Sequence, residues 1–260
     1  MKIILFILFS LFTFNSFGQK NPQIKVLTYN ILHGETMAGD FDLDKIAKVI
    51  QESGAHIVAL QEVDYKTNRA HKKDLTMELA YRCQMQAVFA KAMEYDDGEY
   101  GEAILSKWSF YQTNNHALPF SGGNEPRAAL ETKFILESGD TIVFIGTHLD
   151  HLASDHDRVL QANQLLNLFK NRDIPCILAG DLNDVPESES IQILKSYWQL
   201  SDQKDVADPT YPAINPRKKI DYIMLAPADR WKVLDTQTIC DTIASDHCGY
   251  LVTLILLPKQ

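Results

Sequence analysis

Short apolar runs that end in polar residues recur along the chain, and they predict a series of strands. The clearest run is Cys176–Ala179, which follows Pro175 and leads into Gly180 and a cluster of acids and amides. A short unbroken apolar run has no exposed face, which is typical of a buried strand. The other strands predicted from such runs are 24–32, 56–63, 100–106, 128–136, 142–149, 220–225, 233–240 and 249–256.

Segments with apolar residues at helical spacing lie between these strands. The segment 43–53 follows Asp42, which can cap a helix, and it stops at Gly54. The other predicted helices are 74–83, 156–170 with Asp155 as its cap, and 187–197, whereas 95–100, 120–126 and 207–216 are expected to be loops. Many strands with only three or four helices predict an α/β fold, in which two mixed sheets pack face to face with the helices outside.

The first 18 residues have the pattern of a secretory signal peptide. Lys2 precedes an apolar stretch over 3–14. Ser16 and Gly18 then supply small residues at the positions that a signal peptidase recognises. The stretch is shorter than the ~20 residues that span a bilayer. We therefore expect export, with cleavage after Gly18 and one mature domain over 19–260 without a transmembrane anchor. An uncleaved short anchor is the alternative.

Charge argues against a nucleic-acid partner. The formal net charge is −9, and removing 1–18 takes away Lys2 and no acid, which leaves −10. Tight binding to a polyanion usually requires a basic patch. The two basic concentrations are Lys66–Lys73 and Arg217–Lys219. They could grip a phosphate, although solvated loops are the commoner explanation.

The four cysteines do not form a zinc motif, because no two are spaced two residues apart. Export permits disulfides, and Cys240 with Cys248 is the pair to test, because the loop between them would clamp Asp246 and His247. Cys83 and Cys176 are equally plausible as free buried thiols.

Polar side chains follow several predicted strands at the point where each ends. Asp181 and Asn183 stand two apart, so in extended geometry they project from the same side. An acceptor and an amide so placed can hold an attacking water or a phosphate oxygen, although a simple turn explains the same residues. The other polar residues at strand ends are Asn30, Glu62, His148, Asp150, Asp221, Asp246 and His247.

Seven motifs occur in a fixed order over residues 24–257. They are Thr28–Ile31, Leu60–Val63, Tyr100–Ser106, Gly146–Leu149, Gly180–Asn183, Ile220–Ile223 and Ser245–His247. This ordered set resembles the endonuclease/exonuclease/phosphatase superfamily. The resemblance implies a four-layer α/β/β/α sandwich and metal-dependent cleavage of a phosphate ester, usually with Mg²⁺ and with Mn²⁺ as an alternative.

The resemblance also implies roles for individual residues. It marks Glu62 as the main metal ligand, with Asn30 and Asp246 beside the metal, and Mg²⁺ does favour one or two carboxylates with water and phosphate oxygens. It makes Asp181, held by Asn183, the residue that orients or deprotonates the attacking water. His247, with Asp221 as its carboxylate partner, would bind the phosphate or share the role of base.

Two further assignments concern the phosphate and the leaving group. The resemblance places His148 as a leaving-group acid, with Glu102 as a carboxylate partner that would favour the protonated imidazole. Arg127 is a candidate phosphate clamp, and a strand-edge arginine is the alternative. The remaining histidines are interpreted as surface or packing residues, with His151 the exception to watch; they are His33, His56, His71, His116, His151 and His156.

The leading hypothesis is therefore an exported, monomeric, Mg²⁺-dependent phosphoesterase. The acidic charge favours a small phosphate ester, a sugar or inositol phosphate or a lipid head group as substrate. A secreted nuclease acting on DNA or RNA is the alternative. An inactive binding module is less favoured, because a decayed enzyme would usually have lost one of the motif residues.

Overall fold

The computed structural model of this chain describes residues 23–170, 172–202 and 208–259. The predicted signal peptide over 1–18 lies outside these ranges. Among the described residues, no helix is long and apolar enough to cross a membrane.

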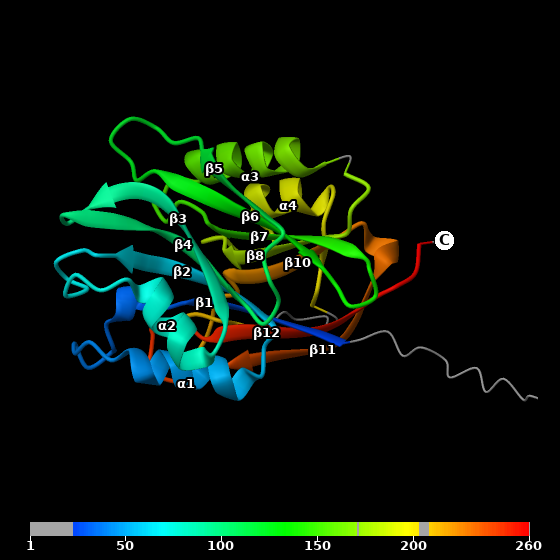
Figure 1. The fold of residues 1–260 in the computed structure, drawn as a ribbon. Helices are drawn as coiled ribbons and strands as arrows, with labels where there is room; N and C mark the ends of the chain where they lie inside the picture. The colour runs from blue at the N-terminus through cyan, green and yellow to red at the C-terminus, as the bar shows by residue number, and fades with distance from the viewer. Residues whose placement is uncertain (1–22, 171, 203–207, 260) are drawn as a thin grey trace, which may run out of the picture.

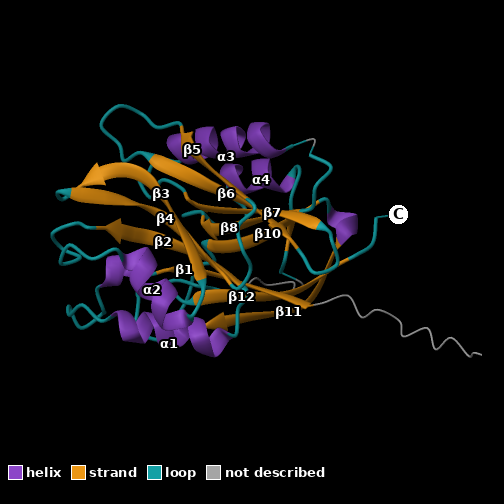
Figure 2. Cartoon of the chain, viewed as in Figure 1, coloured by secondary structure: helices purple, strands orange, loops and turns teal. Residues whose placement is uncertain are grey.

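Two six-stranded mixed sheets face each other and are flanked by helices on both outer sides, which confirms the α/β/β/α sandwich (Figures 1 and 2). The first sheet has the order β11 (Trp231–Ile239), β12 (Gly249–Leu256), β1 (Gln23–Asn30), β2 (Ile57–Tyr65), β4 (Gly98–Ser106) and β3 (Gln86–Tyr95). The second has the order β5 (Gln112–Leu118), β6 (Arg127–Ile135), β7 (Thr141–His148), β8 (Cys176–Asp181), β10 (Asp221–Ala226) and β9 (Gln199–Leu200). The pairs β1–β2 and β7–β8 are parallel.

The helices cover the outer faces of the sheets. The first sheet is covered by α1 (Leu43–Ser53) and α2 (Leu75–Cys83), and the second by α3 (His156–Phe169) and α4 (Glu189–Lys195) (Figure 2). Short 3₁₀ turns, η1 (Leu32–Gly34) and η2 (Ala228–Arg230), follow β1 and precede β11. The Asp42 side chain caps α1 and Gly54 ends it in the left-handed region, as predicted. Asp155 makes no side-chain cap on α3, so that prediction is wrong.

Alternation along the strands builds three apolar layers. Side chains such as Val26, Ile104 and Phe144 fill the space between the sheets, while their strand neighbours pack under the helices. Burying each large aliphatic or aromatic side chain contributes about 1.5–3 kcal/mol. Both faces of the central strands are therefore largely apolar, although a few polar residues such as Thr28 and Thr132 are buried within them.

Three strands were not predicted from the sequence, namely β3, β5 and the two-residue β9. The strand β3 is rich in alanine, methionine, lysine and glutamate, which do not favour strands; its pairing with β4 decides its conformation. The predicted loop over 95–100 is in fact a tight hairpin, since Tyr95 pairs with Gly98 and only Asp96 and Asp97 turn the chain, both with positive φ.

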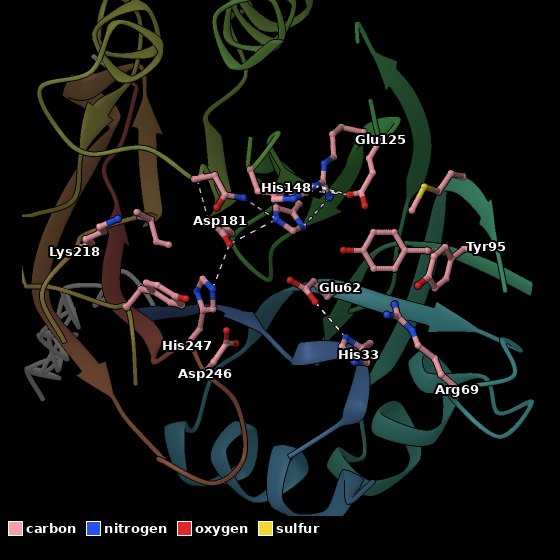
Figure 3. Close-up of a pocket in the computed structure, with 17 residues that line it drawn as sticks. His33, Glu62, Arg69, Tyr95, Glu125, His148, Asp181, Lys218, Asp246 and His247 are labelled. Atoms are coloured by element: carbon pink, nitrogen blue, oxygen red, sulfur yellow. Dashed lines mark hydrogen bonds and ion pairs between the residues drawn. The ribbon is translucent and has the colours of Figure 1, made fainter. Parts of the chain in front are cut away.

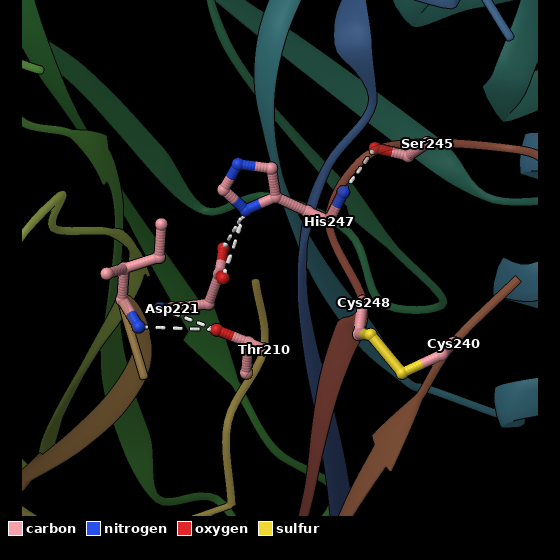
Figure 4. The surroundings of a disulfide bond; sticks show 7 residues. Thr210, Asp221, Cys240, Ser245, His247 and Cys248 are labelled. Atoms are coloured by element: carbon pink, nitrogen blue, oxygen red, sulfur yellow. Dashed lines mark hydrogen bonds and ion pairs between the residues drawn. A yellow bond between two sulfur atoms is a disulfide. The ribbon is translucent and has the colours of Figure 1, made fainter. Parts of the chain in front are cut away.

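The expected disulfide is present between Cys240 and Cys248 and joins the end of β11 to the start of β12 (Figure 4). The loop that it closes carries Asp246 and His247. Cys83 and Cys176 are free thiols, and Cys176 is buried.

A glycine immediately before Asp181 lets β8 approach β7 closely. A Cβ added at Gly180 would lie 2.0 Å from the carbonyl oxygen of Thr147 on β7. We expect Gly180→Ala to lower the free energy of unfolding by about 1–3 kcal/mol, because the strands must separate. Urea denaturation measures this, and Gly122→Ala is the matched control, since nothing lies within 4 Å of a Cβ added there. A Gly180→Ala protein as stable as the control would show that β7 and β8 are packed less tightly.

Candidate active site

Strand ends and loops from both sheets surround a cavity of about 470 Å³ at one end of the sandwich (Figure 3). Seven predicted site residues line it: Glu62, Arg127, His148, Asp181, Asn183, Asp246 and His247. The other three, Asn30, Glu102 and Asp221, are fully buried. Motifs that lie far apart in the sequence therefore meet at one site in the fold.

Sheet register brings the central acid next to its partners. Asp181 ends β8 directly opposite His148 on β7 and Asp221 on β10. The main-chain N–H of Asn183 donates to Oδ1 of Asp181 over 2.9 Å, and Nδ2 of Asn30 donates to Oδ2 over 3.2 Å. Asp181 is thus held by Asn183 as expected, through the backbone of Asn183.

The expected pair of His247 and Asp221 is formed. Nδ1 of His247 lies 3.2 and 3.1 Å from the two carboxylate oxygens of Asp221 (Figure 4). Its Nε2 lies 3.6 Å from Oδ2 of Asp181 (Figure 3). Burial lowers the pKa of His247, but the two carboxylates outweigh burial and raise it to about 10. His247 is therefore a cation at neutral pH.

Asp181 is the group in this pair that can accept a proton at neutral pH. Burial raises its pKa to about 7, against the opposing effects of the His247 cation and the hydrogen bonds from Asn183 and Asn30. A base is most effective when its pKa lies near the working pH. Between Asp181 and His247, the directions of these pKa shifts therefore favour Asp181 as the base.

Glu62 is aimed into the cavity by an irregularity in its strand. The register between β2 and β4 shifts between Leu60 and Val63, and Glu62 adopts a left-handed φ of 59°. Its carboxylate accepts from Nδ2 of Asn30 over 2.9 Å and lies 3.4 Å from Nδ1 of His33. Burial would raise the pKa of Glu62, but these contacts lower it to about 2.

Glu62 and Asp246 together offer carboxylate oxygens that suit a hard divalent cation. Oδ1 of Asp246 is buried and has no hydrogen-bond partner among the described residues. Burial raises the pKa of Asp246, and the Glu62 carboxylate raises it further. Two neighbouring carboxylates, one with an unused oxygen, suit Mg²⁺ or Mn²⁺. The amide oxygen of Asn30 accepts from the main-chain N–H of Leu32 and its Nδ2 donates to Glu62 and Asp181, so Asn30 positions these two carboxylates.

Another buried group could also hold a cation. Ligand atoms of Asp181, Asp221 and His247 lie within 4.8 Å of one another. Because His247 and Asp221 already bond to each other, Glu62 and Asp246 offer the better metal position.

The predicted pair of His148 and Glu102 is not formed. The Glu102 carboxylate is buried without a hydrogen-bond partner, and burial raises its pKa well above the usual range. His148 instead contacts Nη1 of Arg127 over 3.3 Å and Nδ2 of Asn183 over 2.9 Å. Burial and the Arg127 guanidinium lower the pKa of His148 well below its usual value. The expectation of a protonated His148 is therefore wrong.

Arg127 begins β6 and is not a strand-edge surface residue, since only 2% of it is exposed. Its Nη2 lies 3.0 Å from both Nδ1 of His151 and a carboxylate oxygen of Glu125. Arg127 lines the cavity, which agrees with the predicted phosphate clamp, and His151 lines it beside Arg127.

Several cavity residues were not predicted. His33 was interpreted as a surface or packing residue, yet it contacts Glu62 and lines the cavity, so that interpretation is wrong. Its position three residues after Asn30, at the same strand end, was the available signal. The other residues missed are Arg69, Met93, Tyr95, Tyr100, Glu125, Tyr211, Lys218 and Ile220. His56, His71, His116 and His156 do not line this cavity.

The strand ends of the two-sheet sandwich bring together carboxylates, a charged histidine and a buried arginine, an arrangement suited to the chemistry of phosphoesters. The family described as "Endonuclease/Exonuclease/phosphatase family" matches residues 27–247, and the chain belongs to this family. Members of the family are hydrolases that act on phosphoester bonds, and they generally depend on a divalent metal ion.

Solved structures show the same fold at low sequence identity. A family member from Beutenbergia cavernae is 22% identical with a TM-score of 0.76, over 90% of this chain and 72% of that chain. A mannosyl-6-phosphatase from Bacteroides thetaiotaomicron is 19% identical with a TM-score of 0.67, over 90% of this chain and 100% of that chain. The human Nocturnin catalytic domain, with a bound sulfate anion, is 20% identical with a TM-score of 0.70, over 91% of this chain and 96% of that chain.

Proposed function

We propose that the protein is an exported, Mg²⁺-dependent phosphoesterase that hydrolyses a small phosphate ester. The observation that carries the proposal is the single cavity in which Asp181, the His247 cation and the acids Glu62 and Asp246 meet. Export is proposed from the N-terminal pattern of Lys2 followed by an apolar stretch over 3–14.

Each of these residues has a separate role in the proposed hydrolysis. Asp181 accepts the proton of a water, and the water oxygen forms a bond to phosphorus. The bond from phosphorus to the ester oxygen breaks, and the leaving oxygen takes up a proton from solvent water. His247 and Arg127 place positive charge where the phosphate oxygens lie. Glu62 and Asp246 would hold the cation. When bound, the cation would act as a Lewis acid that stabilises negative charge on the phosphate oxygens. His148 is neutral, and its contact with Arg127 orients the guanidinium.

A small substrate is supported by charge and by one similar structure. The chain has a net charge of −9, and the cavity contains four acidic residues, Glu62, Glu125, Asp181 and Asp246. The structurally similar mannosyl-6-phosphatase has a sugar phosphate in its name. A secreted nuclease is the second candidate, because each of the two basic concentrations contributes one residue to the cavity, Arg69 and Lys218.

Hydrolysis of a substrate panel by purified mature protein tests the proposal. We expect phosphate release from small esters in Mg²⁺, none in chelator, and intact supercoiled plasmid under the same conditions. Nicking of the plasmid that requires Mg²⁺ would support the nuclease instead. A folded, metal-supplied protein that cleaves neither would contradict both and favour a binding module.

A further inference from the structure

One end of the cavity carries a group of side chains that have no role in the hydrolysis proposed above, although one of them, Tyr100, hydrogen-bonds to Arg127. Arg69 and Tyr95 lie together at this end, and Lys218 lies at the other, with Glu62 between them (Figure 3). The Cζ atom of Arg69 lies 4.5 Å from the centroid of the Tyr95 ring and 5.7 Å from that of Tyr100. We call Arg69, Tyr95 and Tyr100 the platform.

The platform is fixed by contacts outside the cavity. Nε and Nη2 of Arg69 donate to the two oxygens of the buried Asp64 over 2.7 and 2.9 Å. The main-chain N–H of Arg69 donates to Asp96 in the turn between β3 and β4 over 2.7 Å. A Cβ on Gly98 would lie 2.5 Å from the backbone of Lys66 and Thr67, so loop and hairpin are in close contact. Side chains held this way lose little further freedom on binding a ligand.

The charge of Arg69 is already balanced, which decides what it can recognise. Asp64 occupies the forked edge of the guanidinium that would otherwise bind a phosphate with two hydrogen bonds. Nη1 has no acceptor among the described residues and remains free to donate. Because the buried Asp64 already neutralises Arg69, a second anion would gain little attraction here. A neutral hydroxyl oxygen is the better acceptor for Nη1.

The aromatic members point to a ring that is not flat. The rings of Tyr95 and Tyr100 are tilted by 54° with centroids 6.1 Å apart, so they form no parallel-sided slot for a base. Arg69 covers one face of Tyr95, whose side chain is still partly exposed. A tyrosine offers an apolar face with a polar hydroxyl at its edge. Such a surface matches a ring that has C–H groups on its faces and hydroxyls around its rim.

We propose that the platform is a specificity subsite for a polyhydroxylated ring, a sugar or an inositol, carried by the phosphate ester. The proposal rests on the proposed hydrolytic function of the same cavity. Nη1 of Arg69 donates to a ring hydroxyl, and Tyr95 packs against the C–H face. Arg69 and Tyr95 are specificity residues and take no part in breaking the phosphoester bond.

Kinetics with matched esters test the subsite. The variants are Arg69→Met and Tyr95→Leu, and the substrates are ethyl phosphate, a hexose phosphate, an inositol phosphate and a nucleoside monophosphate. We expect each variant to lose about tenfold in kcat/KM for the hexose or the inositol ester, the equivalent of one hydrogen bond or aromatic contact. The loss for ethyl phosphate should be clearly smaller. Arg82→Met and Tyr111→Leu, which alter residues outside the cavity, are the matched controls.

Tyr95→Leu is the second variant because Arg69→Met leaves the buried Asp64 without its ion-pair partner and with only the Thr67 hydroxyl as donor, which could impair folding. Equal losses on all esters, or none, would overturn the subsite, as would a loss confined to the nucleotide. The ester for which the variants lose kcat/KM, the hexose or the inositol phosphate, identifies the ring that the subsite binds.

Binding in the presence of chelator separates this inference from the proposed function. Saturation-transfer NMR should show the ring protons of the bound hexose or inositol phosphate in contact with the wild type and not with Tyr95→Leu. Ring contacts without hydrolysis of any ester would overturn the proposed function and support the subsite. Hydrolysis without ring contacts would do the reverse.

Discussion

Replacing Asp181 by asparagine is expected to lower kcat by roughly 10²–10⁴-fold, the usual contribution of a well-placed base. Asparagine keeps the size of the side chain and can still accept from the main-chain N–H of Asn183, so the fold should be retained. What it cannot do is take a proton. The substitution also removes the acceptor for Nδ2 of Asn30 and the negative charge beside His247, so thermal unfolding of the variant must be measured alongside its rate.

The pH profile provides the second readout for Asp181. Its pKa is raised to about 7, so wild-type activity should rise as the pH passes through that value and Asp181 loses its proton. The pKa of His247 is raised to about 10, so activity should fall above that pH, as the imidazole loses its charge. In Asp181→Asn the rise near pH 7 should disappear from the residual activity. A variant that keeps both its rate and its rise would exclude Asp181 as the base.

Local patterns predicted the parts of the fold that depend on neighbours in sequence. Helix 43–53 was found at both ends, because Asp42 and Gly54 are capping residues whose effect is local. The strand β8 was predicted because a short unbroken apolar run is typical of a strand that is buried on both faces. The strand β3 was missed because its residues do not favour a strand, and only pairing with β4 holds it there.

The same distinction applies to the site. Asp181, Glu62 and His247 stand in recognisable motifs at strand ends, and the structure brings them together. The partner of His148 was predicted wrongly, because sequence order does not show which of two buried groups, Glu102 or Arg127, reaches the imidazole.

The platform was missed for a related reason. Arg69 was visible only as one of several basic residues in a loop, and Tyr95 lay in a hairpin that was interpreted as a loop. Their meeting depends on the salt bridge from Arg69 to Asp64 and on the turn at Asp96. Contacts of this kind join segments whose separate patterns are unremarkable, so pattern reasoning along the chain does not reach them.

Replacing Glu62 by glutamine should weaken binding of Mg²⁺ or Mn²⁺ by about 100-fold or more, because changes in residues that only support a metal ligand already cost 10–100-fold. The amide removes a charge from the pair formed with Asp246 while keeping the side-chain shape. Isothermal titration of metal-free protein measures the affinity directly, without relying on turnover. Activity at low Mg²⁺ should fall in parallel and recover in part at high Mg²⁺.

The matched control is Glu35→Gln. Glu35 contacts the other nitrogen of the same imidazole, His33 Nε2, over 3.2 Å, and it does not line the cavity. Its substitution changes the charge around His33 equally but should leave metal affinity nearly unchanged. Metal-free Glu62→Gln should melt lower than the wild type at neutral pH, because the contacts that lower the pKa of Glu62 to about 2 stabilise its charged form in the folded protein. Equal metal affinity in the two variants would show that Glu62 is not a metal ligand and would favour the group formed by Asp181, Asp221 and His247 as the metal site.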